Sequence, residues 1–280
     1  AQRVRRSEAV ATIGAQLLGS PKARAALGEE LFVVCEQVCV AACDFNAPAL
    51  VRQTLGALQE AFPDSMRVGR LEGLALEAEG RFGEAEEVYA ALLKKQPGNA
   101  DAMKRRVALA KARAGPEEAI KLLTEYLEAY AADTEAWAEL AELYLSLSMY
   151  KQAAYCLEEV LLSAPHDAAK HLRYAEVMYT LGGTENVLAA RKYFAAAVEL
   201  SGGHSVRALY GLCACAQALA GAKGHKLSLG EAKLYANAAD RLRTLYAQVD
   251  SKHETLLAGA LEAMGVYAEP SARAQDPART

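Results

Sequence analysis

The sequence lacks the hallmarks of several large classes of protein. Its 280 residues include only 8 Pro, 20 Gly and 1 Trp, and 35 acidic residues outnumber 31 basic ones. The resulting net charge of −4 argues against a non-specific nucleic-acid binder, which needs a strong basic surplus. The longest uncharged run, residues 208–222, is shorter than the roughly 18 apolar residues of a membrane-spanning helix. We therefore expect neither nucleic-acid binding nor a membrane-spanning segment.

Sequence motifs of catalysis and of cofactor binding are also missing. The chain contains no HExxH, GxSxG, GxxxxGK or GxGxxG segment, and its 5 His do not have the spacing of a zinc site. Its 6 Cys lack the paired spacing of a disulfide framework, which favours reduced thiols, and its start shows no secretory signal. We predict no catalytic residue, no metal and no cofactor.

What the sequence does contain is alanine and a repeat. Alanine, the strongest helix former, occurs 60 times, which favours an all-helical chain. Pro63 and Pro97 are 34 residues apart, and Pro165 follows after two further steps of 34. The same step separates three alanines, each twelve residues before a matching proline position: Ala85, Ala119 and Ala153. A period of 34 residues is typical of the tetratricopeptide repeat (TPR), a pair of antiparallel helices.

The clearest repeat covers residues 134–167. Trp137, Leu140 and Tyr144 lie at i, i+3 and i+7, so they share one face of its first helix. Pro165 cannot continue the second helix, so the chain turns there into the next repeat. We expect Trp137 to be a buried anchor of the core, because it occupies the inward aromatic position of the repeat.

The repeat frame predicts an all-α TPR solenoid of about five to six repeats, with N-terminal and capping helices. We expect an N-terminal helical segment at residues 1–31, the solenoid at 32–250, and a capping helix with a disordered tail at 251–280. The frame places the starts of six units near Phe32, Met66, Ala100, Thr134, Ala168 and Val206.

Local features refine this prediction. In the N-terminal segment, Val10, Ile13, Leu17 and Leu18 predict one helix. Gly19-Ser20-Pro21 predicts a break before a second helix that runs into the first unit. Two charged residues, Glu72 and Arg106, occupy the same normally apolar frame position in consecutive repeats. We expect them to lie side by side and to form an ion pair.

Three cysteines share one helical face. Cys35, Cys39 and Cys43 lie at i, i+4 and i+8, which admits a metal or redox cluster. No histidine lies near them in the sequence, and small thiols commonly fill the seam between packed helices. We favour the packing role, and keep an enzyme with a cysteine-based site as the alternative from another functional class.

The first helices of TPR units line a concave groove in which partners bind. A basic run on the first helix of the third unit suggests an acidic or C-terminal peptide as ligand, and a merely solvated face is the alternative; the run consists of Lys104, Arg105, Arg106, Lys111 and Arg113. The following units add apolar and acidic residues. Electrostatic complementarity would orient such a segment, and desolvated apolar side chains would anchor it. Counting along the frame, the expected groove residues are Arg70, Lys104, Arg105, Ala108, Lys111, Ala138, Glu142, Leu145, Leu172, Glu176 and Tyr179.

Beyond a generic repeat, the chain resembles a known family. The most specific stretch is AEVMYTLGGTEN at residues 175–186, followed by RKYF at 191–194, and the likeness extends over roughly residues 30–212. These segments are similar to subunit 2 of the ER membrane protein complex. The resemblance implies a cytosolic, peripheral subunit of a machine that inserts transmembrane helices, including those of tail-anchored proteins, into the ER membrane.

The resemblance also implies partners and a location. It predicts a non-enzymatic scaffold on the cytoplasmic face of the ER membrane, bound to the membrane-embedded and cytosolic subunits of that complex. Its concave groove would hold a cytosolic stretch of a membrane-embedded subunit. A TPR adaptor of another multiprotein or chaperone assembly is the alternative.

Overall fold

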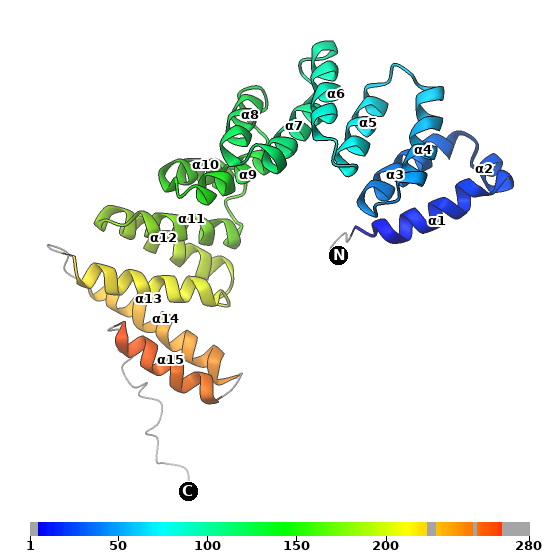
Figure 1. Ribbon diagram of the computed structural model, residues 1–280. Coiled ribbons are helices and arrows are strands. Elements are labelled where there is room, and N and C mark those ends of the chain that lie inside the picture. Colours follow the sequence, from blue (N-terminus) through cyan, green and yellow to red (C-terminus); the bar gives the residue numbers. More distant parts are fainter. Residues whose placement is uncertain (1–4, 223–227, 249–250, 265–280) are drawn as a thin grey trace, which may run out of the picture. The chain divides into compact units, whose positions relative to one another are not determined.

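A computed structural model of the chain describes residues 5–222, 228–248 and 251–264. These ranges are helical with short connections, and they contain no strand. The chain divides into two compact units, residues 1–131 (unit 1) and 132–280 (unit 2). In each unit, consecutive helices pack against one another in sequence order (Figure 1). The all-α TPR fold predicted from the sequence is confirmed.

Unit 1 contains nine of the helices described. They are α1 (Ser7–Gly19), α2 (Pro21–Leu27), the 3-10 helix η1 (Gly28–Glu30), α3 (Leu31–Asp44), α4 (Pro48–Ala61), α5 (Met66–Ala78), α6 (Phe82–Lys95), α7 (Ala100–Arg113) and α8 (Pro116–Ala129). Unit 2 contains α9 (Thr134–Ser146), α10 (Tyr150–Ser163), α11 (Ala168–Leu181), α12 (Thr184–Leu200), α13 (Val206–Ala220), α14 (Leu229–Ala247) and α15 (Ser251–Ala263).

The repeat frame located the first helix of every repeat. Five of the six predicted starts coincide with the first residue of a helix, and the sixth, Phe32, is the second residue of α3. Local chemistry fixes several of these starts, because an Asn, Asp or Ser side chain accepts a hydrogen bond from a backbone N–H of the first turn. The residues that cap α7, α9, α11 and α13 in this way are Asn99, Asp133, Asp167 and Ser205.

Small residues at fixed frame positions let the two helices of a repeat approach closely. Ala85, Ala119, Ala153 and Ala190 are all fully buried, at 0% exposure. In unit 1, a Cβ on Gly73 of α5 would lie 2.4 Å from the ring of Tyr89 on α6. Only a glycine leaves room for that ring, so close helix packing in this repeat depends on the missing side chain.

Unit 2 has the same kind of close contact between helices at a glycine, made by other residues. A Cβ on Gly211 of α13 would lie 2.4 Å from the ring of Phe194 on α12. Phe194 belongs to one continuous cluster of buried apolar side chains that extends from α11 to α15. In unit 1, by contrast, one cluster covers α1 to α5 and a separate one covers α6 and α7.

Three local expectations were wrong. The second helix does not run into the first repeat, because α2 ends at Leu27 and Gly28, with a φ of +51°, separates it from α3. Trp137 is half-buried, with its ring against the edge of exposed Tyr155 at 6.0 Å between centroids. The core position goes to its neighbours Ala136 and Leu140, at 2% and 3% exposure.

The expected Glu72–Arg106 pair does not form. Arg106 Nε instead donates to Glu86 Oε1 of α6 at 2.7 Å. Glu72 lies in the wall of a cavity of about 560 Å³ that α4, α5 and α6 enclose. The carboxylate that pairs with Arg106 therefore comes from α6, the second helix of the preceding repeat. It does not come from α5, the first helix of that repeat.

Two further points concern the extent of the fold. In the described part of the chain, no helix is long and apolar enough to cross a membrane. The division into segments 1–31, 32–250 and 251–280 stays a prediction. The boundary between the two compact units, at Ala131, falls inside the predicted solenoid. The expected disordered tail lies mostly outside the described residues.

Candidate partner-binding surfaces

The first helices of the repeats form the surface on which the predicted groove residues lie. In unit 1, α3 contacts α5 and α5 contacts α7; in unit 2, α11 contacts α13. We call the surface of α3, α5 and α7 the first inner face and that of α9, α11 and α13 the second inner face. The predicted set divides between them: Arg70, Lys104, Arg105, Ala108 and Lys111 on the first, and Ala138, Glu142, Leu145, Leu172, Glu176 and Tyr179 on the second.

On the first inner face, Arg70 links three consecutive first helices. Its guanidinium lies 2.5 Å from Asp101 of α7 and 3.6 Å from Glu36 of α3. Glu36 also accepts a hydrogen bond from Arg67, one turn earlier on α5. Arg70 is therefore engaged with carboxylates of its own chain, and its positive charge is largely compensated.

Arg105 is engaged more deeply. Its Nε donates to Glu77 Oε1 at 3.1 Å, and its second nitrogen donates to the other carboxylate oxygen. Tyr89 also donates to Glu77 Oε1, at 2.6 Å. Burial lowers the pKa of Arg105, but the hydrogen bonds and negative charge of Glu77, together with Tyr89, outweigh this and hold the pKa above its ordinary value. Burial, together with the Glu77 carboxylate, raises the pKa of Tyr89. This network joins α5, α6 and α7, so Arg105 has a structural role.

Two lysines of the predicted set remain at the surface. Lys104 is exposed, with its ammonium 5.3 Å from the centre of the Tyr126 ring of α8. Lys111 is also exposed, in the last turn of α7. Ala108 lies between them in the sequence and is half-buried. Lys104 and Lys111 are thus the basic residues of the predicted set with exposed side chains.

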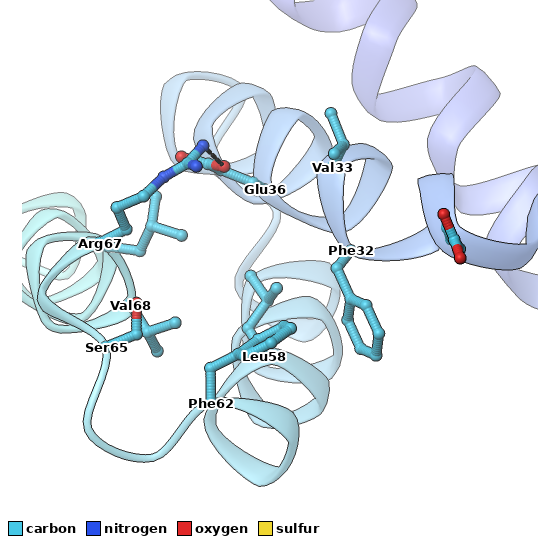
Figure 2. A pocket seen from close by; sticks show the side chains of 10 residues that line it. Phe32, Val33, Glu36, Leu58, Phe62, Ser65, Arg67 and Val68 are labelled. Atoms are coloured by element: carbon cyan, nitrogen blue, oxygen red, sulfur yellow. Dashed lines mark hydrogen bonds and ion pairs between the residues drawn. The ribbon is translucent and has the colours of Figure 1, made fainter.

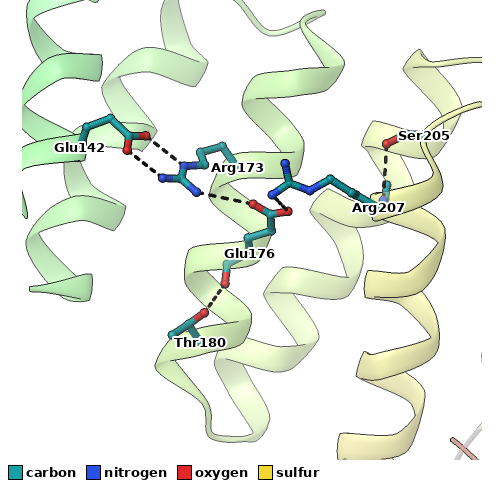
Figure 3. A network of polar contacts seen from close by, with 7 residues as sticks. Glu142, Arg173, Glu176, Thr180, Ser205 and Arg207 are labelled. Atoms are coloured by element: carbon teal, nitrogen blue, oxygen red, sulfur yellow. Dashed lines mark hydrogen bonds and ion pairs between the residues drawn. The ribbon is translucent and has the colours of Figure 1, made fainter. Parts of the chain in front are cut away.

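The second inner face carries a ladder of alternating charges (Figure 3). Arg173 of α11 donates to both carboxylate oxygens of Glu142 of α9, at 3.0 and 2.8 Å. Arg173 also lies 3.8 Å from Glu176, and Glu176 lies 2.6 Å from Arg207 of α13. Glu142 is exposed at one end of the ladder and Arg207 at the other. The acidic residues predicted here are thus balanced by two arginines.

The apolar residues predicted for the second inner face are half-buried. Leu172 and Tyr179 pack against the core cluster of unit 2, and Tyr179 also lines a cavity of about 350 Å³ near the Gly182-Gly183 turn. Leu145 and Ala138 on α9 are half-buried as well. Each keeps a part of its surface available for contact with another molecule.

A hollow on unit 1 was not predicted from the sequence (Figure 2). It has a volume of about 300 Å³ and lies between α3, the end of α4 and the start of α5. Leu58, Val68 and Leu71 form an apolar floor. Phe32 and Phe62 meet edge to face above it, with ring centroids 4.9 Å apart. We call it the Phe62 hollow; its size and lining suit one large apolar side chain.

The cysteines are packing residues of the helix seams. Cys35 and Cys39 are buried at 3% and 0% exposure, and no group of three metal-ligating side chains forms among the described residues. A hydrogen bond from Cys43 holds the pKa of Cys39 below its usual range. In unit 2, burial raises the pKa of Cys213 to about 11 and that of Cys215 to about 12. Those two thiols are protonated and shielded at neutral pH.

Sequence reasoning missed the compensating charges, although a signal for some of them existed. Glu36 and Glu77 occupy the same frame positions as the predicted residues Arg70 and Lys111, in the neighbouring repeats. Arg173 occupies the frame position of Arg105. Applying the frame to every repeat would have found all three. The Phe62 hollow left no such signal, because it depends on how far α4 and α5 stand apart.

The paired helices, the small residues at their crossings and the 34-residue frame define a TPR protein. Among solved structures, the chain is similar to the C-terminal part of a TPR repeat-containing protein from Cytophaga hutchinsonii, with a TM-score of 0.60. The match covers 88% of this chain and 96% of that one, at 13% sequence identity. This likeness extends to the fold alone.

Sequence comparison places the chain more narrowly. The family described as the EMC2 TPR-like repeat domain matches residues 55–189. ER membrane protein complex subunit 2-A of Xenopus laevis is 42% identical over 211 residues, which cover 75% of this chain and 70% of that protein. Subunit 2 of the same complex from Dictyostelium discoideum is 37% identical, over 62% of this chain and 54% of its own. The chain belongs to the family of ER membrane protein complex subunit 2.

Proposed function

We propose that this protein is a non-enzymatic scaffold subunit of an ER membrane protein complex, located on the cytoplasmic face of the ER membrane. In that role it supports the insertion of transmembrane proteins, including tail-anchored ones. Its inner faces hold cytosolic segments of the membrane-embedded subunits, and other surfaces hold cytosolic subunits. The observation that carries the proposal is the identity of 42% over 75% of the chain with subunit 2 of such a complex.

The surfaces of the chain support a binding role. The first inner face offers two exposed lysines, and the second offers a charge ladder whose ends, Glu142 and Arg207, are open to solvent. A partner segment with both signs of charge can exchange ion pairs with such a ladder at little cost, because exposed pairs contribute little by themselves. Affinity then comes from apolar contacts, and orientation from charge.

The test is assembly of the complex in cells that lack the endogenous subunit. We expect the full chain to co-purify in mild detergent with multi-pass ER membrane proteins, and to restore insertion of a tail-anchored reporter. Charge reversal by Lys104→Glu with Lys111→Glu should weaken this co-purification and leave the protein folded, since both side chains are exposed. Arg105 is left intact, because it holds Glu77 and a loss there would report on folding.

A matched control reverses two charges on a second helix. Lys94→Glu with Lys95→Glu changes the net charge equally on α6, away from the inner faces, and should leave assembly intact. Unchanged co-purification of the Lys104/Lys111 variant would show that the first inner face is not the docking surface. Co-purification of the wild-type chain with a soluble chaperone, in place of ER membrane proteins, would refute the proposal in favour of the adaptor role.

A further inference from the structure

Helix α1 carries two parallel apolar stripes, and one of them is packed. Ala11, Gly14 and Leu18 are buried, and they hold α1 against α3. The approach is so close that a Cβ on Gly14 would lie 2.3 Å from a methyl carbon of Val38. Because this stripe anchors the helix firmly, the orientation of the second stripe is fixed as well.

The second stripe lies beside the packed one, about 100° around the helix, and is open to solvent. Val10, Ile13 and Leu17 each precede a residue of the packed stripe by one position and have the same i, i+3, i+7 spacing. They are 40%, 57% and 36% exposed. Exposed apolar side chains that line up along one helix mark a contact surface, so this stripe calls for a covering partner.

Cations stand at both ends of this stripe. Arg6 directly precedes α1, and Lys22 and Arg24 follow it on α2; all three are exposed. Arg5 is also exposed but pairs with Asp44 at 2.7 Å. The one acidic residue of α1, Glu8, lies two positions before Val10, which is about 200° around the helix and away from the stripe.

Two acidic residues, Glu29 and Glu30, follow these cations in the sequence, and one of them lies on another surface. Glu29 lines the Phe62 hollow together with Glu36 of α3. Glu36 and Val38 are two positions apart, so they point to opposite sides of α3, and Val38 is the side on which α1 packs. Glu29 therefore does not offset the cations beside the stripe. Glu30 is exposed, and it is the one carboxylate of this turn outside that hollow.

We propose that α1 lays this stripe on an anionic lipid surface. An amphipathic helix binds a bilayer in this way when its apolar side chains enter the boundary between headgroups and acyl chains while its cations meet lipid phosphates. Cations at both ends of a straight stripe can contact several headgroups at once if these headgroups lie in one plane. A bilayer surface provides such a plane. This contact is separate from the inner faces, so it adds a direct membrane contact to any that partners supply.

The apolar half of the proposal is tested by vesicle flotation. The full-length chain is mixed with vesicles of phosphatidylcholine alone, or of phosphatidylcholine with phosphatidylserine. We expect it to float with the anionic vesicles only. Ile13→Ser with Leu17→Ser should weaken that binding roughly tenfold or more, since both side chains leave the bilayer boundary. Leu162→Ser with Leu200→Ser, at two exposed leucines of unit 2, is the matched control and should bind like wild type.

The charged half is tested with neutral substitutions. Arg6→Gln, Lys22→Gln and Arg24→Gln together should weaken binding to anionic vesicles roughly fivefold for each cation removed. Removing three exposed lysines elsewhere, by Lys94→Gln, Lys95→Gln and Lys192→Gln, is the matched control. Circular dichroism of every variant should match wild type, because all substituted side chains are exposed.

The proposal is overturned if the wild-type chain does not float with anionic vesicles, floats equally with neutral ones, or floats unchanged after the Ile13/Leu17 substitutions. It is also overturned if those substitutions remove a protein partner from the detergent-solubilised complex, since the stripe would then be a protein interface. The proposed scaffold function is judged separately, because the Lys104/Lys111 variant keeps the α1 stripe and the Ile13/Leu17 variant keeps both inner faces.

Discussion

Unit 1 and unit 2 use the same 34-residue frame but build their cores differently. In unit 2, one continuous apolar cluster joins α11 to α15. In unit 1, one cluster covers α1 to α5 and another covers α6 and α7, with Met66 and Leu76 of α5 packed against the second. The charged network of Arg105 and Glu77 also connects α5 with α7 there. A repeat frame therefore specifies where helices lie, while the residues at its inward positions decide whether neighbouring repeats share one core.

The first repeat shows how one position affects packing. Where later repeats have the fully buried alanines Ala85, Ala119 and Ala153, the first has Val51. Val51 lines the cavity of about 560 Å³ beside α5 and α6, and the Phe62 hollow lies on another side of the same junction. Val51 is itself buried, at 5% exposure, so the α3–α4 pair accommodates the larger side chain in its packing.

The largest effect is expected when one buried aromatic ring is removed from each unit. Phe194→Ala and Tyr89→Ala should each lower the free energy of unfolding by about 3–5 kcal/mol. Because the core of unit 2 is continuous, we expect Phe194→Ala to weaken hydrogen-exchange protection from α11 to α15. Tyr89→Ala should affect α5 to α7 and spare α1 to α3. Equal loss of protection in α1 to α3 would show that the two clusters of unit 1 act as one.

A smaller effect should come from filling the space beside these rings. Gly73→Ala and Gly211→Ala each place a methyl group within 2.4 Å of a ring, and overpacking of this kind costs about 1–3 kcal/mol. Gly56→Ala is the matched control, since nothing lies within 4 Å of its Cβ position in α4. There we expect a gain of about 0.5–1 kcal/mol from helix propensity. Urea unfolding measures all three, and destabilisation by Gly56→Ala would contradict the packing argument.

The smallest effect on stability is expected for Arg105 and Arg173, which occupy equivalent frame positions. Arg105→Ala leaves the half-buried Glu77 without its cation, with only the Tyr89 hydroxyl as donor, and should cost about 1–3 kcal/mol. Arg173→Ala removes exposed ion pairs and should cost at most about 1 kcal/mol, with a strong dependence on salt. Thermal unfolding at low and high salt separates the two cases. Equal losses with equal salt dependence would mean that burial does not distinguish the networks.

The sequence predicted the fold closely, and two of its three errors share one cause. Periodicity fixed the helix starts, because a period of 34 residues and the capping side chains are local properties. Trp137 was assigned to the core from its place in the repeat. Which side of α9 is buried, however, depends on how the neighbouring helix packs against it. The Glu72–Arg106 pair failed for the same reason, since Glu86 of α6 offered Arg106 a closer carboxylate.

The sequence by itself determined the TPR frame, the starts of the repeats, the absence of known catalytic motifs and the family to which the chain is similar. Only the tertiary structure decided which charges remain available, since Arg70 and Arg105 are compensated by residues 31 and 28 positions away. It alone opened the Phe62 hollow and left the stripe of Val10, Ile13 and Leu17 uncovered. The physical reason is that a repeat pattern encodes contacts within a helix pair, whereas exposure and charge compensation arise between pairs.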